Sequence, residues 1–311
     1  MLSLVCVALF IGCDVSQKPA QEKRDKRLSD SELLKLPGVK PEGSSQQFLF
    51  GFDLRSSPQE DARQYLSFLN YLQQQTGYRF KLRFTPRDGE IVEDLGNGVV
   101  QFAAIGAVSY ILAADKYNVK PLVRGLNTEN KAEYRSMFIV RLNSRMRKLD
   151  DLIGKRLAFG NLSSTQGHLI PRIVLSKNNI KLSQLSEYDY MGSHQKCADA
   201  VISGRFDVCG LQDTMANELE RQHKVRILHR SEYYPSSGVA VNKDVAEDVI
   251  VKVMQAMLDF QPKGKDASKL YNWNKTEMPN GFVVADNNDY ASLRKWLLKI
   301  SLNNKQQVPD S

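Results

Sequence analysis

The segment FGNLSSTQGHLIP (159–171) connects a short apolar run to an amphipathic stretch. The run RLAFGN (156–161) has the apolar character of a buried strand, and the residues from Thr165 to Asn178 have the periodicity of a helix. Ser163 and Ser164 stand where serine commonly caps a helix. A polar turn that carries the chain from a buried strand into a helix is typical of an α/β sheet.

The same turn has the chemistry of an anion-binding site. The first amide groups of a helix have no intrahelical acceptor and lie at the positive end of the helix dipole. The hydroxyls of Ser164 and Thr165 add two donors at the same place, and Gln166 follows them. A tetrahedral oxyanion fits such a turn without a metal ion or a lysine. Ordinary capping is the alternative, in which Ser163 or Ser164 serves only its own helix.

Short apolar runs alternate with amphipathic stretches on both sides of this segment. Before it, the expected elements are a strand at 48–54, a helix from Ser57-Pro58 to Gly77, strands at 80–84 and 99–106, helices near 88–96 and at 107–117, and a strand at 136–142. After it, strands are expected at 188–191, 206–211, 225–230 and 238–243, and helices at 194–203, 213–222, 244–260 and 289–300. This alternation predicts an α/β fold with parallel crossovers, arranged as two lobes with a C-terminal return.

Length and composition are those of a folded globular protein. The chain has 311 residues, of which 42% are hydrophobic and 25% charged, and these values exclude collagen, a coiled coil and a polytopic membrane protein. The net charge of +8 suits an anionic partner without distinguishing nucleic acid from lipid headgroups or a small oxyanion. Because the basic residues are scattered and the N-terminus indicates export, no nucleic-acid partner is expected.

The N-terminus has the pattern of an export signal. Residues 1–12, MLSLVCVALFIG, are apolar and uncharged, too short to span a bilayer as a helix and typical of the apolar region of a signal peptide. Ile-Gly-Cys before Asp14 resembles the lipobox of bacterial lipoproteins, which implies that Cys13 is acylated and that the protein is retained at the periplasmic face of the inner membrane. A cleaved soluble signal and a buried N-terminal segment are the alternatives, and no basic residue precedes the apolar run.

Several motifs in one order and spacing resemble the phosphonate/phosphite-type substrate-binding proteins of ABC transporters. The resemblance covers roughly residues 48–300. Besides the 159–171 segment, its motifs are Phe50-Gly-Phe, Thr85-Pro86, Ile105-Gly-Ala-Val-Ser-Tyr110, Tyr134-Arg-Ser136, Gly192-Ser-His194 and the pattern from Ala200 to Asp207. The family implies a type II periplasmic-binding-protein fold (a Venus flytrap), with ligand in the cleft between two α/β lobes joined by two crossing strands.

The N-terminal pattern and the resemblance together predict a division of the chain. The expected parts are a lipoprotein signal peptide at 1–12, a lipid-anchored flexible tether at 13–46, the first part of lobe 1 at 47–137, lobe 2 at 138–235, the return to lobe 1 with the C-terminal helices at 236–305, and a tail at 306–311.

Candidate ligand contacts follow from the positions that match the family. These are Ser164, Thr165 and Gln166 on the turn, Gln166 standing where the family has a third hydroxyl, together with His194, Asp213, Tyr110, Tyr134, Asp88 and Ser237.

Each of these side chains has a structural alternative or departs from the family. His194 and Asp213 could instead be a surface or capping histidine and the cap of the next helix, and Tyr110 and Tyr134 could pack in the core. Asp88 stands where the family has a ligand-contacting aromatic. Ser237 aligns with the acidic residue that holds a ligand amine in aminoalkylphosphonate binders, so the organic part of the ligand is left open.

Other chemistries receive little support from the sequence. A hydrolase would need Ser164 as nucleophile with His168 or His194 as base and Asp213 as orienter, but no G-x-S-x-G elbow is present. The four histidines have no metal-binding spacing, so neither a metal nor another cofactor is expected. Cys197 and Cys209 could form a disulfide in an exported protein or remain as two buried thiols.

The sequence thus predicts a lipid-anchored solute-binding protein of an ABC uptake system, and no enzyme. Its expected ligand is a phosphorus oxyanion (phosphonate, phosphite or phosphate), captured by lobe closure and delivered to the transmembrane subunits of the permease. A monomer is expected. The alternative is a periplasmic sensing module that signals to a membrane kinase.

Overall fold

The computed structural model describes residues 46–85 and 90–305, all of which belong to one unit, residues 45–311. The predictions about the signal peptide, Cys13, nearly all of the tether, Asp88 and the tail lie outside the described residues. Within the described residues, no helix is both long and apolar enough to cross a bilayer.

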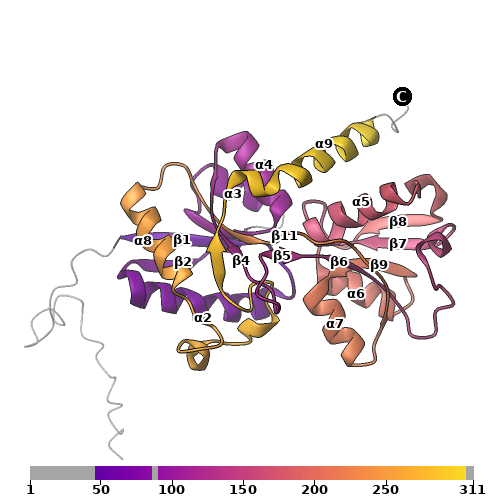
Figure 1. Cartoon of the computed structure of the whole chain (residues 1–311), viewed down its shortest axis with the longest axis horizontal. Coiled ribbons are helices and arrows are strands. Elements are labelled where there is room, and N and C mark those ends of the chain that lie inside the picture. The colour runs from indigo at the N-terminus through magenta and orange to yellow at the C-terminus, as the bar shows by residue number, and fades with distance from the viewer. Residues whose placement is uncertain (1–45, 86–89, 306–311) are drawn as a thin grey trace, which may run out of the picture. The chain divides into compact units, whose positions relative to one another are not determined.

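The first lobe is built on a six-stranded mixed sheet (Figure 1). Its strands are β1 (Gln47–Phe52), β2 (Arg79–Leu82), β3 (Phe102–Ile105), β4 (Lys120–Gly125), β12 (Gly238–Val241) and β13 (Phe282–Val284), in the order β13-β4-β12-β3-β1-β2. Strand β1 is parallel to both β2 and β3, as the strand–helix alternation predicted. The later strands β12 and β13 are antiparallel to their neighbours, because the chain re-enters this lobe from the other one.

Among the described residues, this lobe has the helices α2 (Pro58–Thr76), α3 (Ile91–Gly96), α4 (Ala107–Tyr117), α8 (Glu247–Leu258) and α9 (Ala291–Lys305). Helix α2 begins and ends as predicted, since Ser57 Oγ accepts a hydrogen bond from the amide of Glu60, Pro58 is the first helical residue and Gly77 adopts the left-handed conformation at φ 72°, which glycine tolerates best. Helix α9 packs against α4 and also against the second lobe.

The second lobe contains a five-stranded mixed sheet. Its strands are β6 (Ser136–Val140), β7 (Arg156–Phe159), β8 (Glu187–Tyr190), β9 (Val208–Gln212) and β10 (Arg226–Arg230), in the order β10-β6-β9-β7-β8. Its helices are α5 (Ile170–Lys177), α6 (His194–Ile202) and α7 (Asp213–Arg221). Cys197 in α6 and Cys209 in β9 form a disulfide with their Cα atoms 6.0 Å apart.

Two short antiparallel strands, β5 (Glu133–Tyr134) and β11 (Tyr234–Pro235), carry the chain out of the first lobe and back into it. Figure 1 shows them between the two sheets. This arrangement is the predicted two-lobed α/β fold with two crossing strands. Short 3₁₀ segments complete the connections at Leu149–Leu152, Leu182–Gln184, Ala267–Lys269, Trp273–Lys275 and Asn287–Tyr290.

Two expected helices differ from the structure. The helix expected from Thr165 to Asn178 begins with a π-helical turn, Thr165–Leu169, and becomes regular α-helix only at Ile170. The helix expected near 88–96 begins at Ile91. A π-helical turn is rare and occurs often at functional sites.

Candidate ligand-binding site

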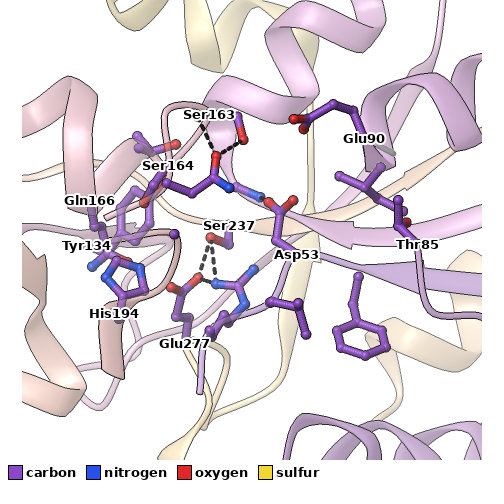
Figure 2. A pocket seen from close by; sticks show the side chains of 18 of the residues that line it. Asp53, Thr85, Glu90, Tyr134, Ser163, Ser164, Gln166, His194, Ser237 and Glu277 are labelled. Atoms are coloured by element: carbon purple, nitrogen blue, oxygen red, sulfur yellow. Dashed lines mark hydrogen bonds and ion pairs between the residues drawn. The ribbon is translucent and has the colours of Figure 1, made fainter. Parts of the chain in front are cut away.

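A cavity of ≈ 320 Å³ lies where the two lobes meet, and side chains of both lobes line it. Figure 2 shows Ser164, Gln166, Tyr134 and His194 on one side of this cavity, opposite Thr85 and Glu90, with Asp53, Ser237 and Glu277 between them. The lining also includes Arg55, Gly106, Asn161, Ser163 and Thr165. The predicted anion turn therefore faces the first lobe across the cavity.

The turn at the start of the π-helical segment has the geometry of an anion site. Ser164 Oγ accepts a hydrogen bond from the amide of Gly167 at 2.9 Å, and its carbonyl oxygen accepts from His168 at 3.1 Å and Leu169 at 3.0 Å. The amides of Thr165 and Gln166 precede these donors and, as at any helix start, have no acceptor within the helix. Ser164 therefore caps its own helix, as the alternative interpretation expected, and its hydroxyl proton remains free to be donated.

Two glycines allow this turn to pack tightly. The amide of Gly160 donates to the carbonyl oxygen of Gly167 at 2.8 Å. A Cβ atom on Gly167 would lie 2.9 Å from Ser164 Oγ and 3.1 Å from both Gly160 Cα and His194 Cε1, closer than packed atoms normally approach. Glycine at this position therefore brings His194 into contact with the turn.

His168 stabilises the turn through contacts of both its ring nitrogens. Its Nδ1 lies 2.7 Å from the carbonyl oxygen of Leu162, and its Nε2 lies 3.1 Å from the hydroxyl of Tyr190. Burial lowers the pKa of His168 to about 4, so the ring is neutral at pH 7. Since both ring nitrogens are engaged, His168 positions the 161–165 loop and is not placed to act as a base for Ser164.

Nδ1 of His194 in this lining is buried and has no hydrogen-bond partner among the described residues. The hydroxyl of Tyr134 is also buried, beside the side chains of Thr165 and Ser237 and the backbone of Ala107. Burial lowers the pKa of His194 to about 3 and raises that of Tyr134 to about 12, so at neutral pH the imidazole is uncharged and the phenol keeps its proton. A buried polar group without a partner is costly, and a ligand in the cavity can provide a partner for His194 Nδ1.

Gln166 connects the turn to Asp213. Its Nε2 donates to the carbonyl oxygen of Arg135 at 2.9 Å and to Asp213 Oδ1 at 3.3 Å, and its Oε1 is buried without a partner among the described residues. Asp213 is the first residue of α7, and burial raises its pKa. It lines a neighbouring hollow and not the cavity that contains the turn.

A buried ion pair that sequence reasoning missed lies next to Ser237. The guanidinium of Arg55 contacts the carboxylate of Glu277, and the hydroxyl of Ser237 donates to the same carboxylate. Arg55 Nη1 also lies 3.5 Å from Ser237 Oγ. Position 237 has no acidic group, but Glu277 places a carboxylate beside it. This carboxylate is already paired with the guanidinium of Arg55.

Asp53 is a second acidic group that the sequence analysis did not single out. Its Oδ2 accepts hydrogen bonds from the amide of Gly106 at 2.8 Å and from Ser109 Oγ at 3.1 Å. Burial raises its pKa, and Arg55 opposes this shift. The N-terminus of α4 is therefore capped by a carboxylate of its own lobe.

A family model described as "ABC transporter, phosphonate, periplasmic substrate-binding protein" matches residues 50–290. The chain belongs to this family. Membership implies a location outside the cytoplasm, a small-molecule ligand and an ABC permease as partner.

Individual relatives agree with the family model. The phosphonates-binding periplasmic protein of Escherichia coli is 25% identical over 236 residues, which cover 72% of this chain and 70% of that protein. The binding-protein component of an ABC phosphonate transporter from Pseudomonas aeruginosa superposes with a TM-score of 0.75 at 19% identity and covers 86% of this chain and 90% of its own. PhnD1 from Prochlorococcus marinus, solved with methylphosphonate, has a TM-score of 0.72 at 17% identity and covers 83% and 99%. The solved structures establish the type II periplasmic-binding-protein fold.

The structure brings together some candidate contacts and separates others. Ser164, Thr165, Gln166, His194, Tyr134 and Ser237 line one cavity. Tyr110 lies outside its lining, since its hydroxyl donates to Asn287 Oδ1 at 2.9 Å and its ring packs on Tyr290 at a centroid distance of 4.5 Å. Tyr110 therefore packs in the core, which was the alternative interpretation of this residue. No cluster of His, Cys, Asp or Glu that could hold a metal ion occurs within the part of the chain that the structure describes.

Proposed function

We propose that this protein captures a phosphorus oxyanion, a phosphonate, phosphite or phosphate, by closing its two lobes and delivers it to the permease of an ABC uptake system. The observation that carries this proposal is the helix N-terminus at Ser164 and Thr165, which lines a cavity at the junction of the lobes together with the unpartnered Nδ1 of His194. A ligand that satisfies these groups recovers the free energy that their burial costs.

The donors match the needs of a tetrahedral oxyanion. The amides of Thr165 and Gln166 lie at a helix N-terminus, and the hydroxyls of Ser164 and Thr165 stand beside them. Tyr134 and, in its Nδ1–H tautomer, His194 add neutral donors from other elements. Several donors arranged around one point hold an oxyanion without a bound metal ion.

Lobe closure follows from the way the two lobes share the cavity lining. The turn, Gln166 and His194 belong to the second lobe, whereas Tyr134 lies on the crossing strand β5, and Thr85 and Gly106 line the cavity from the first lobe. A ligand that contacts both sides binds the closed arrangement more tightly and shifts the population toward it. We further propose that the permease recognises this closed form.

Membrane attachment is proposed through Cys13. An acylated cysteine with several chains would hold the protein firmly at the periplasmic face of the inner membrane. Mass spectrometry of the protein purified from its native membrane tests this directly. A mature chain that begins before residue 13, or an unmodified Cys13, would contradict the proposed lipid anchor.

A thermal-shift panel of phosphate, phosphite, methylphosphonate, sulfate and nitrate, each with and without EDTA, tests the ligand class. A ligand at 100 times its Kd adds about 2.7 kcal/mol to the stability of the folded state, which raises Tm by about 5–10 °C for a protein of this size. At least one phosphorus oxyanion should give this shift in the presence of EDTA. The absence of a shift with all three phosphorus compounds would contradict the proposed function.

Small-angle scattering then tests closure. The radius of gyration should decrease when the ligand found in the panel is added, and chelator should leave the decrease unchanged. Tight binding without any change in the radius of gyration would contradict the closure mechanism while leaving the ligand class intact.

A further inference from the structure

Side-chain oxygens of both lobes converge beside Gly106 in the ligand cavity. A Cβ atom on Gly106 would lie 3.2 Å from Thr165 Oγ1, 3.5 Å from Asp53 Oδ2 and 3.9 Å from Ser237 Oγ, its nearest neighbours outside the adjacent residues. Because glycine has no Cβ atom, the backbone leaves this point to a ligand. Thr165 Oγ1 and Asp53 Oδ2 are therefore close enough together to contact one tetrahedral oxyanion on the turn.

The carboxylate of Asp53 can accept a hydrogen bond from such a ligand. Asp53 lines the cavity, and Figure 2 shows it between Ser164 and Glu90. Its Oδ2 accepts hydrogen bonds from the amide of Gly106 at 2.8 Å and from Ser109 Oγ at 3.1 Å, and its Oδ1 lies 3.3 Å from the same hydroxyl. An ionised carboxylate has about four acceptor positions and no proton to donate. Only a ligand oxygen that carries a proton can therefore make a hydrogen bond to it.

A fully deprotonated oxyanion would be repelled at the same place. Burial raises the pKa of Asp53, and the charge of Arg55 opposes this shift. The other titratable groups that interact with Asp53 are Glu90, whose pKa is raised by burial and then by Asp53, and the buried hydroxyl of Tyr65. Arg55 is paired with Glu277, so its charge does not cancel that of Asp53. A proton held between Asp53 and the ligand oxygen removes the repulsion between two anions.

We propose that Asp53 makes ligand binding depend on a proton, so that the site takes a phosphorus oxyanion whose P–O–H group donates to the Asp53 carboxylate. Sulfonates and sulfate, which carry no proton at neutral pH, are then rejected. This inference rests on the proposed function, because it places the oxyanion on the turn at Thr165. An ammonium group does not suit this position, because Arg55 would repel a second cation beside Asp53.

Calorimetric titration of the full chain with methylphosphonate and methanesulfonate tests this selection. The two ligands have the same shape, but only the phosphonate can carry a proton. A site that hydrogen-bonds a ligand hydroxyl strongly rejects an analogue without it. At neutral pH the wild type should therefore bind methylphosphonate at least about 100-fold more tightly than methanesulfonate.

The variant Asp53→Asn assigns the selection to this carboxylate. The amide oxygen can still accept from Gly106, whereas the negative charge is removed. Methanesulfonate should bind more tightly than in the wild type, and the ratio of the two Kd values, measured within each protein, should fall to about tenfold or less. Asp207→Asn is the matched control, because Asp207 forms a partly buried pair with Arg156 outside the cavity lining. It should keep the wild-type ratio.

Proton uptake by the wild type gives a second measurement, which does not depend on the folding of a variant. Methylphosphonate is titrated in two buffers whose ionisation enthalpies differ, at a pH below and at a pH above its second ionisation. Above this ionisation, binding should take up about one proton, and Kd should rise by about tenfold for each pH unit. Below it, the ligand already carries the proton, and the uptake should be close to zero.

The outcomes separate this inference from the proposed function. If methanesulfonate binds the wild type as tightly as methylphosphonate, or if the dianion binds without proton uptake, the role of Asp53 is overturned while oxyanion binding stands. Selection that survives in Asp53→Asn, or that disappears in Glu90→Gln alone, overturns it as well. If 2-aminoethylphosphonate binds far more tightly than methylphosphonate and Asp53→Asn removes that advantage, Asp53 binds an ammonium group instead. If methylphosphonate, phosphite and phosphate all fail to bind, the proposed function itself fails.

Discussion

The backbone amide of Val108 donates a hydrogen bond to Thr165 Oγ1 across 2.8 Å. Val108 lies in the first turn of α4 in the first lobe, and Thr165 begins the π-helical turn in the second. Because the Thr165 oxygen accepts this bond, its own proton is directed elsewhere, and it can be donated to the neighbouring Tyr134 hydroxyl or to a ligand. One hydroxyl thus joins the two lobes and offers a donor to the cavity.

The first prediction concerns this hydroxyl. Thr165→Val keeps the shape of a side chain that is 3% exposed but removes the donor, so the Kd for the best oxyanion of the panel should rise by about 10- to 150-fold. Isothermal titration measures the change. Thr165→Ser is the control, since it restores the hydroxyl and should bind within a few-fold of wild type. An unchanged Kd in the valine variant would show that the oxyanion does not bind at this turn.

The second prediction concerns pH and the buried imidazole of His194. Burial, assisted by the charge of Arg55, lowers the pKa of this residue from its ordinary 6.5 to about 3 in the folded protein. Between these two values the unfolded chain binds a proton that the folded chain does not. Stability therefore falls as the pH is lowered below about 6.5, by about 2 kcal/mol at pH 5 for one such group.

Urea unfolding of the wild type and of His194→Gln at pH 7 and pH 5 measures this contribution. The free energy of unfolding of the wild type should fall by about 2 kcal/mol more than that of the variant between the two pH values. The raised pKa values of Asp53, Asp61 and Asp213 act in the opposite direction, but these groups are present in both proteins and cancel in the comparison. Equal losses would show that His194 is already solvated in the folded state.

Local sequence rules predicted the elements that carry the site. Ser57 and Pro58 begin α2 and Gly77 ends it. The strand–turn–helix pattern places Ser164 and Thr165 at the cavity. These features depend on residues a few positions apart, so the sequence contains them directly.

Long-range packing accounts for what the sequence did not reveal. Arg55 and Glu277 lie far apart along the chain, and nothing near either residue indicates that they form a buried pair. The position of Tyr110 could not be predicted from its sequence neighbours either, because their apolar character is compatible with a cavity and with a core. Its place depends on packing against Tyr290 near the C-terminus. Burial of a charge depends on a partner that only the assembled fold supplies.

The third prediction concerns the close approach at Gly167. Gly167→Ala places a methyl group 3.1 Å from both Gly160 Cα and His194 Cε1, which should displace the turn and lower oxyanion affinity by about tenfold or more. Gly154→Ala is the control. It strains a backbone at φ 72° without any atom within 4 Å of the new methyl group, so it should lower Tm and leave the Kd unchanged. Equal loss of affinity in both variants would attribute the effect to general destabilisation.

The last prediction separates stability from binding through the disulfide between Cys197 and Cys209. The two residues are 12 positions apart, and a loop of this size restricts the unfolded chain by about 3 kcal/mol in the chain-entropy model. The double variant Cys197→Ala/Cys209→Ala should therefore unfold at lower urea concentration, by about 3 kcal/mol, whereas its Kd should match that of the wild type because neither residue lines the ligand cavity. Wild-type protein unfolded and refolded in reductant should show the same loss, which controls for the removed sulfur atoms. If reduction leaves the stability unchanged while the double alanine variant is destabilised, the sulfur atoms contribute by packing as buried thiols, and the covalent link contributes nothing.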